Sequence, residues 1–453
     1  MIQEEKCFNC LEEFLDSTFQ SHQVLYLGMS GNKMGDEGVS SLGSGLEKCT
    51  NLFNLTLNLD RNKIGDKGIS YLGSHLGKCT NLSNLTLNLM DNNIDVIDAV
   101  GAPDLGFGLG KCTNLSNLAL FLSGNQIGEE GASGLGSGLG NCLNLSNLTL
   151  NLYGNKIGDK GTSGLGSGLG KCKNLSNLTL NLSDNAIGVE GASGLGYGLG
   201  KFVNLQNLTL YLCNNIIGDE GASGLVSGLG QSTNLSDLTL DLSNNKICAI
   251  GASGFGSGLE NCTSLSKLTL DFRYNIFGDE GVSGLGYGLG KCANLFNLSL
   301  ILSGNKFGGE GISGLGSGLG KCNNLSNLEL YLNDIKIDDK SKSDLGSSLG
   351  NFTNLSNLIF CLSGNEIGDQ GATSIGFGLE RCTNLSNLKL VLPFNEIGDE
   401  TALCLVSSLR KCTNLSNLEL NLIGNKINEP QQLKVNCLKL KKLVFFEYFD
   451  DQW

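Results

Sequence analysis

The sequence has little proline, histidine and aromatic content. Its 453 residues include only 3 prolines, 2 histidines and 1 tryptophan, and aromatic side chains make up 6%. No apolar run reaches the roughly 18 residues that a membrane-spanning helix needs. A general acid or base needs a positioned partner, and none is evident for His22 or for His75, which we interpret as an exposed variant within a helix. These absences argue against a membrane span and against an enzyme.

Positive charge is also scarce, because 31 Lys and Arg face 44 Asp and Glu, a net charge of −13. Nucleic-acid binders need clustered Lys and Arg, so we expect no nucleic acid and no membrane partner, and a basic protein is easier to accommodate. Alternatively, the acids only cap helices and keep the chain soluble. The first residues carry acids where a signal peptide needs a basic start. We therefore expect a cytoplasmic, or else nuclear, protein.

Glycine is abundant, with 66 residues, and it belongs to a repeat marked by asparagine. The spacing of these asparagines is 30 residues at each step, apart from Asn92 to Asn125, and Ile335 stands where one is missing. A period of 20 to 50 residues indicates stacked supersecondary units. The repeated asparagines are Asn32, Asn62, Asn92, Asn125, Asn155, Asn185, Asn215, Asn245, Asn275, Asn305, Asn365, Asn395 and Asn425.

Each repeat predicts one strand and one helix. Leu85, Leu87 and Leu89 alternate with polar residues, which places the leucines on one face of a short strand. The asparagine that follows is expected to satisfy backbone groups at the turn, so that stacked copies form a ladder. Leucines four apart, such as Leu135 and Leu139, give the helix one inward edge. Asp and Glu of the GDEG phrase are suited to the helix start.

The repeat, written LxxLxLxLxxNxIGDEGAxxLxxxLxKCxxL, resembles the leucine-rich repeat of the ribonuclease-inhibitor type. The resemblance implies an α/β solenoid, a horseshoe with a parallel sheet on its concave face and short helices on its convex face. About 14 repeats of 30 residues would form one domain over residues 21–430, between an N-terminal cap (1–20) and a C-terminal cap (431–453).

Two features depart from that family. The strand phrase is two residues longer, and GLGSGLG replaces an alanine-rich helix. Each Ala-to-Gly exchange weakens a helix by about 1 kcal/mol. We therefore expect short or frayed glycine-rich helices that depend on stacking and that approach one another closely. The glycine phrases do not match the spacing of a phosphate-binding loop.

Ten of the 17 cysteines occupy one repeat position, which also accepts Phe202, Ser232 and Phe352. Such a position is an apolar packing site, so we expect buried free thiols. The pair Cys7 and Cys10 has the spacing of half a zinc site, but no second pair follows. A helical N-terminal cap is the preferred interpretation, and we expect no metal and no cofactor. The ten are Cys49, Cys79, Cys112, Cys142, Cys172, Cys262, Cys292, Cys322, Cys382 and Cys412.

Two irregular segments interrupt the pattern. The insert at residues 96–104 is expected to bulge from the convex side, and the unit around Ile335 loses both its asparagine and its glycines. Either is a docking feature or the local decay of a repeat. The aromatic-rich C-terminal segment reads as a last strand that covers the core.

Partner-binding residues are expected on the strands, pointing away from the leucines. Counting four and two positions back from each asparagine gives side chains on the concave face. Most are Asn, Thr or Ser, and aromatic and Arg side chains among the exceptions are types enriched at binding hot spots. The alternative is drift between duplicated repeats. The predicted partner-binding residues are Phe121, Tyr153, Tyr211, Asp241, Asp271, Arg273, Tyr274, Ile301, Tyr331 and Phe394.

Three functional hypotheses follow. The first is a non-enzymatic, monomeric scaffold that binds a partner protein on the concave face. The second is a GTPase activator, because the repeats also resemble those of Ran GTPase-activating proteins, although the acidic tail of that family is missing here. Similar repeats also form the sensor domains of innate-immune receptors. The third is a tandem expansion without a single dedicated ligand.

Overall fold

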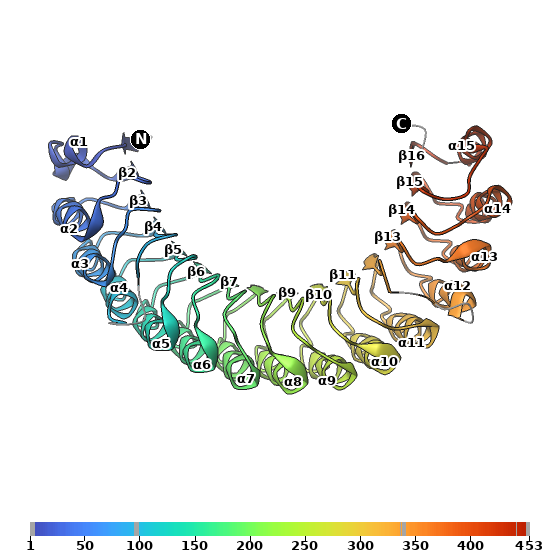
Figure 1. Cartoon of the computed structure of the whole chain (residues 1–453), viewed down its shortest axis with the longest axis horizontal. Coiled ribbons are helices and arrows are strands. Elements are labelled where there is room, and N and C mark those ends of the chain that lie inside the picture. Colours follow the sequence, from blue (N-terminus) through green and yellow to red (C-terminus); the bar gives the residue numbers. More distant parts are fainter. Residues whose placement is uncertain (1–4, 95–98, 336, 338–340, 441, 450–453) are drawn as a thin grey trace. The chain divides into compact units, whose positions relative to one another are not determined.

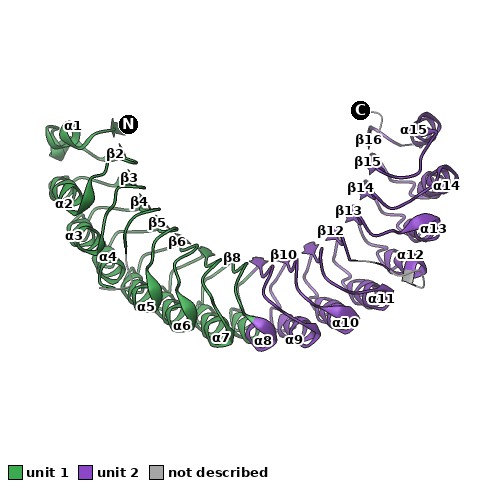
Figure 2. Cartoon of the chain, viewed as in Figure 1, with its two compact units in different colours: residues 1–217, 224–235 green, residues 218–223, 236–453 purple. Residues whose placement is uncertain are grey.

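The computed structural model describes residues 5–94, 99–335, 337, 341–440 and 442–449. The chain divides into two compact units, unit 1 (residues 1–217 and 224–235) and unit 2 (residues 218–223 and 236–453) (Figure 2). Helix α8 (Gly218–Leu229) contributes residues to both. Within each unit the strands lie side by side on the concave side, and the helices cover their convex side (Figure 1). This is the predicted α/β solenoid.

The strands of each unit are parallel and are neighbours in sequence order. The strands of unit 1 are β1 (Glu5–Phe8), β2 (Val24–Gly28), β3 (Asn54–Asn58), β4 (Asn84–Asn88), β5 (Asn117–Phe121), β6 (Asn147–Asn151), β7 (Asn177–Asn181) and β8 (Asn207–Tyr211). Those of unit 2 are β9 (Asp237–Asp241), β10 (Lys267–Asp271), β11 (Asn297–Ile301), β12 (Asn327–Tyr331), β13 (Asn357–Cys361), β14 (Asn387–Val391), β15 (Asn417–Asn421) and β16 (Phe445–Phe449).

One helix follows most strands. The helices of unit 1 are α1 (Leu11–Leu15), the 3-10 helix η1 (Phe19–Ser21), α2 (Gly35–Leu46), α3 (Asp66–Leu76), α4 (Gly101–Leu109), α5 (Gly128–Leu139), α6 (Gly158–Leu169) and α7 (Val189–Leu199). Those of unit 2 are α9 (Ala249–Leu259), α10 (Gly278–Leu289), α11 (Gly309–Leu319), the 3-10 helix η2 (Ser341–Ser343), α12 (Asp344–Leu349), α13 (Gly368–Leu379), α14 (Asp399–Leu409) and α15 (Pro430–Leu438). No described helix has the length and apolarity that crossing a membrane requires.

Glycines on the helices make close packing possible. Helix α5 is 12 residues long, and its Gly136 and Gly138 are buried. A Cβ at Gly136 would lie 2.6 Å from Leu165 Cα, and one at Gly138 would lie 2.3 Å from Gly106 C. No side chain fits at these contacts with the neighbouring helices. The helices are short, as expected, but the glycines do not interrupt them, because the stacked neighbours hold the backbone in place.

The repeated asparagine forms the expected ladder. Asn185 is buried, and its Nδ2 donates to Leu152 O at 2.9 Å and to Ser183 O at 3.0 Å. Its Oδ1 accepts from the backbone N–H groups of Asn155 at 2.9 Å and Ile157 at 3.3 Å. One amide therefore satisfies four backbone groups, in its own repeat and in the preceding one.

In unit 2 this ladder is interrupted at Ile335, whose side chain cannot pair with the backbone of the preceding repeat, and separately at Asn305. Asn305 retains the hydrogen bonds that its amide nitrogen donates: Nδ2 donates to Phe272 O at 2.8 Å and to Leu302 O at 2.9 Å. Its Oδ1 is buried and has no hydrogen-bond partner among the described residues. Among its described residues, the repeat of Ile335 has only the short α-helix α12, of 6 residues. The repeat around Ile335 therefore lacks both a regular helix and the ladder asparagine.

The acids of the GDEG phrase cap the helix of the following repeat rather than their own. Asp159 lies in the first turn of α6, and its Oδ1 accepts from Gly188 N at 2.7 Å and Gly191 N at 2.9 Å at the start of α7. Asp279 makes the same contacts with Gly308 N and Gly311 N, at 2.6 and 2.9 Å. The expected N-cap role is therefore real, but it connects two repeats.

The prediction of buried free thiols is confirmed for all ten cysteines of the shared position. Cys172 Sγ, for example, donates to Leu139 O of the preceding repeat at 3.3 Å. Burial raises the pKa of Cys172 to about 11 and that of Cys142 to about 12. These thiols therefore stay protonated and act as packing groups.

Among the described residues at the two ends of the chain, the structure differs from the predicted secondary structure only in the N-terminal segment. The predicted N-terminal helix is wrong for Glu5–Phe8, which form strand β1 and pair with β2. Polar Glu5 and Lys6 obscured its alternation. The predicted C-terminal strand is confirmed as β16, which pairs with β15. In the insert, α4 begins at Gly101 and contains Pro103, whereas residues 96–98 lie outside the described residues.

Candidate functional site

The face of each sheet opposite the helices, here called the open face, carries three rows of side chains. The rows are formed by the first, third and fifth residue of each strand, because the second and fourth residues are the buried leucines. Register between strands places equivalent residues next to one another, about 4.8 Å apart. Counting back four and two positions from each repeated asparagine in the sequence covered only the third row and the residue two positions after it. The alternation from Asn84 to Asn88 already contained the other two rows.

The first row is a second asparagine ladder. In unit 1 the Nδ2 of Asn147 donates to Asn117 Oδ1 at 2.5 Å, and Asn177 and Asn207 continue the chain. In unit 2 Asp237 and Lys267 replace two of these asparagines and form an ion pair at 2.9 Å. The side-chain amides therefore hold one another in place across the open face.

Five of the predicted partner-binding residues lie together on unit 2. Asp241, Asp271, Ile301 and Tyr331 are register neighbours in the third row. Arg273 follows Asp271 and pairs with it, Nη2 to Oδ2 at 2.6 Å and Nε to Oδ1 at 3.0 Å. Asp271 is only 8% exposed, so it is held by Arg273 rather than left free to receive a partner.

Glu329 of the second row joins this group, and sequence counting missed it. Its Oε2 accepts from Ser299 Oγ at 2.9 Å and lies 3.5 Å from Tyr331 Oη. Burial, followed by the charge of Glu329, raises the pKa of Tyr331 to about 12. The Asp271 carboxylate raises the pKa of Arg273 by hydrogen bonding. We call Asp241, Asp271, Arg273, Ile301, Glu329 and Tyr331 the unit 2 patch.

The other predicted residues do not join the patch. In unit 1, Phe121 and Tyr211 lie in the third row, but Asn151 and Asn181 separate them. Tyr153 follows strand β6, and its hydroxyl donates to Asp184 Oδ2 at 2.9 Å, which raises the pKa of Tyr153. Phe121 and Tyr211 therefore do not form a continuous group in the third row of unit 1.

Tyr274 and Phe394 lie at the turns that follow their strands, with φ of 56° and 55°. They are 66% and 63% exposed. A Cβ at Gly304 would lie 2.6 Å from Tyr274 Cδ1, and one at Gly424 would lie 2.3 Å from Phe394 Cδ1. Each ring thus covers a glycine of the next repeat, at the edge of the open face.

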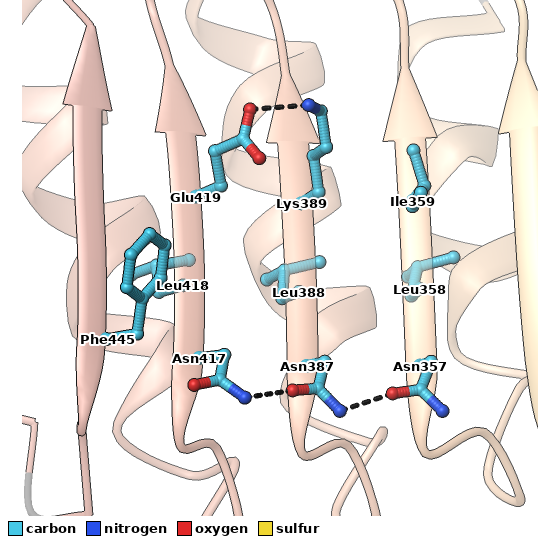
Figure 3. Close-up of a pocket in the computed structure, with 10 residues that line it drawn as sticks. All are labelled: Asn357, Leu358, Ile359, Asn387, Leu388, Lys389, Asn417, Leu418, Glu419 and Phe445. Carbon is cyan, nitrogen blue, oxygen red and sulfur yellow. Dashed lines mark hydrogen bonds and ion pairs between the residues drawn. The ribbon is translucent and has the colours of Figure 1, made fainter.

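Unit 2 also has a recess of about 300 Å³ on its open face (Figure 3). Its polar groups are already paired, since the Nδ2 groups of Asn387 and Asn417 donate to the preceding asparagines and Lys389 Nζ lies 2.6 Å from Glu419 Oε1. The rest of the lining is apolar. The recess is lined by Asn357, Leu358, Ile359, Asn387, Leu388, Lys389, Asn417, Leu418, Glu419 and Phe445.

Catalytic and metal-binding geometry is not apparent in the described part of the chain. No group of three His, Cys, Asp or Glu side chains there could hold a metal ion. His22 is buried and its Nε2 lies 2.8 Å from Ser17 Oγ. His75 is half-buried rather than exposed, because its Nδ1 lies 2.6 Å from Glu47 Oε2. Both histidines therefore have structural contacts.

Comparison with known proteins gives a match to one family model and similarity to solved structures. Eight segments match the family model described as Leucine Rich repeat, at residues 20–43, 51–73, 118–136, 144–166, 174–196, 264–286, 298–316 and 362–376. These segments are similar to leucine-rich repeats and together cover less than half of the chain. No curated protein sequence matches the chain. Among solved structures, a leucine-rich-repeat protein of Leptospira interrogans is similar over 97% of this chain and 99% of its own, with 18% identity and a TM-score of 0.47.

Proposed function

We propose that the protein is a non-enzymatic scaffold that binds a partner protein through the open face of unit 2. Leucine-rich repeats are commonly interaction modules, which supports the general class. The observation that carries the assignment is the unit 2 patch, where acidic, basic, aliphatic and aromatic side chains replace the repeated Asn and Thr in neighbouring strands. Such mixed clusters resemble binding hot spots.

The charge of the patch favours a basic partner. It contains three carboxylates, Asp241, Asp271 and Glu329, and one guanidinium, Arg273, so two negative charges are in surplus. Asp271 is paired with Arg273. Asp241 accepts from Ser243, by its N–H at 2.9 Å and its Oγ at 2.6 Å, and its charge also contributes to the raised pKa of Arg273. Lys or Arg side chains of a partner would complement Asp241 and Glu329. The recess is suited to an apolar side chain of the same partner.

We also propose that the protein is located in the cytoplasm or the nucleus.

A pull-down from cytosolic extract tests the proposal. The variant Ile301→Ala with Tyr331→Ala changes the patch without breaking the Asp271–Arg273 pair. Asn151→Ala with Asn181→Ala makes equivalent third-row changes in unit 1 and is the matched control. We expect that the wild type and the control retain a protein that the patch variant does not retain. Once purified, this partner should bind the wild type and the control more tightly than the patch variant. Equal retention by all three chains would contradict the assignment to unit 2.

No described contact favours the alternative of a GTPase activator, and it stays a prediction from resemblance. Its test is separate, because it needs only single-turnover GTP hydrolysis by a Ran-type GTPase with and without the protein. If the wild type and the patch variant both increase the rate of GTP hydrolysis, the GTPase-activator function would replace the scaffold proposal.

A further inference from the structure

Strand β16 has one edge that is not paired within the described part of unit 2. Its only hydrogen-bonded neighbour there is β15. Phe445 N donates to Ser416 O at 3.1 Å, and Phe449 O accepts from Leu422 N at 3.2 Å. Successive residues of a strand direct their backbone groups to opposite edges. The N–H and C=O groups of Phe446 therefore point away from β15, where a further strand would meet them.

Apart from Glu447, the described residues of this edge lack the features by which strands usually avoid unwanted pairing. Val444 and Phe445 are 87% and 51% exposed, and Phe446 is only half-buried. Edge strands are normally protected by charged residues, prolines or bulges. Strand β1 of unit 1 follows that rule with Glu5 and Lys6. The sequence FFEYF of β16 instead offers apolar surface beside available backbone groups.

The single charge in β16 restricts what this edge accepts. Glu447 is exposed and lies in register with Glu419, which is already paired with Lys389 at 2.6 Å. Two carboxylates therefore share one ammonium group, which leaves one negative charge in surplus. An opposite charge directly across from Glu447 on an added strand would be stabilising, and a like charge would be destabilising.

We propose that the edge of β16 that faces away from β15 binds an extended segment of a partner protein by strand addition, through the N–H and C=O groups of Phe446. Backbone hydrogen bonds supply general affinity, and alternate side chains supply specificity. The segment carries apolar residues next to Phe445 and Phe449 and a Lys or Arg next to Glu447. A second copy of β16 fits less well, because antiparallel pairing centred on this strand opposes Glu447 to itself. The inference is independent of the unit 2 patch.

A labelled peptide tests the charge rule directly. The sequence TVTKTVT reads the same in both directions, so it places Val, Lys and Val opposite the three open-face positions of β16 in either orientation. We expect fluorescence anisotropy to show binding about fivefold tighter than that of TVTETVT. In the Glu447→Lys chain the preference should reverse. Equal binding of both peptides to both chains would overturn the proposal.

A pair of substitutions tests the backbone edge. Phe446→Pro and Phe446→Ala both remove the ring, but only proline also removes the N–H that points away from β15. Once circular dichroism shows that both chains fold alike, we expect TVTKTVT to bind the Ala chain and not the Pro chain. Equal binding would exclude strand addition, and the charge reversal remains decisive if the Pro chain does not fold.

Two further results separate this proposal from its competitors. Sedimentation that shows dimers of the wild type and monomers of Phe446→Pro would make a second copy the occupant and would overturn the partner segment. The Ile301→Ala with Tyr331→Ala chain should bind TVTKTVT as the wild type does. Both proposals predict that this chain loses the extract partner and keeps the peptide. Retention of the extract partner would overturn only the assignment to the unit 2 patch, and absence of peptide binding to the wild type would overturn only the strand addition.

Discussion

The open faces of the two units differ although their backbones repeat the same elements. In strands β3 to β8 of unit 1, the three rows contain no charged residue, and Asn and Thr fill most positions. In unit 2, the rows include the ion pairs Asp237–Lys267 and Lys389–Glu419. The leucine core and the buried asparagines are common to both. The open face is therefore not needed to specify the fold, and it is available for binding.

The largest expected effect compares the buried ladder in the two units. Asn185→Ala removes an amide that serves four backbone groups, whereas Asn305→Ala removes one whose Oδ1 has no described partner. Each buried group left unpaired costs roughly 1–3 kcal/mol. We expect urea unfolding to show a loss of about 4 kcal/mol for Asn185→Ala and about half of that for Asn305→Ala. Equal losses would show that the interruption in unit 2 has no energetic consequence.

The next effect concerns the glycines between helices. Gly136→Ala raises helix propensity, but its Cβ would lie 2.6 Å from Leu165 Cα. Overpacking of this kind costs about 1–3 kcal/mol, more than the roughly 1 kcal/mol gained from propensity. We expect a lower thermal midpoint for Gly136→Ala than for Ser137→Ala, its neighbour in the same helix. A stabilised Gly136→Ala chain would mean that the helices do not need this close approach.

Acid should weaken unit 1 selectively, since the buried His22 lies there. Burial, followed by the charge of Lys6, lowers the pKa of His22 from its usual 6.5. Above pH 6.5 the imidazole is neutral in both states. As the pH falls below 6.5, the unfolded chain binds a proton that the folded chain does not, so stability decreases. The protection factors of the amides in β1 and β2, which correct for slower intrinsic exchange at lower pH, should fall between pH 6.5 and 5.5, and His22→Phe should remove that change. Persistence in the variant would exclude His22 as the cause.

The smallest effect comes from converting the first row of unit 2 to that of unit 1. Asp237→Asn with Lys267→Asn removes an ion pair whose side chains are 31% and 52% exposed and restores the amide ladder. Exposed ion pairs contribute about 0.2–1 kcal/mol, so we expect a change in unfolding free energy within about 0.5 kcal/mol. Binding of the unit 2 partner should become less dependent on salt. A large loss of stability would show that the charges specify the fold after all.

Much of the fold follows from the sequence, because alternation and spacing fix which side chains are buried. Leu85, Leu87 and Asn92 occupy the predicted positions for this reason. Strand β1 was not predicted, since Lys6 takes a position equivalent to the buried Leu25. The close approach of the helices at their glycines was predicted, but fraying was also expected, because helix propensity does not include contacts between repeats.

The candidate site was predicted only in part. A fixed offset from the asparagine identified Asp241, Asp271, Ile301 and Tyr331, which the sheet register brings together. The same offset missed Glu329, because the second row was not counted. It could not show that Asp271 is paired with Arg273, since the direction of a side chain depends on rotamers rather than on spacing. Whether these residues bind a partner remains a prediction.

The glycines between helices have a consequence for how the chain acquires its structure. A segment such as GEEGASGLGSGL has little tendency to form a helix before its neighbours are in place. Its backbone contacts with Leu165 and Gly106 belong to the adjacent repeats. Low stability of single repeats combined with strong nearest-neighbour terms makes folding of a linear array highly cooperative. We therefore expect order to spread from a nucleus of several repeats, so that a short fragment of the array would remain unfolded.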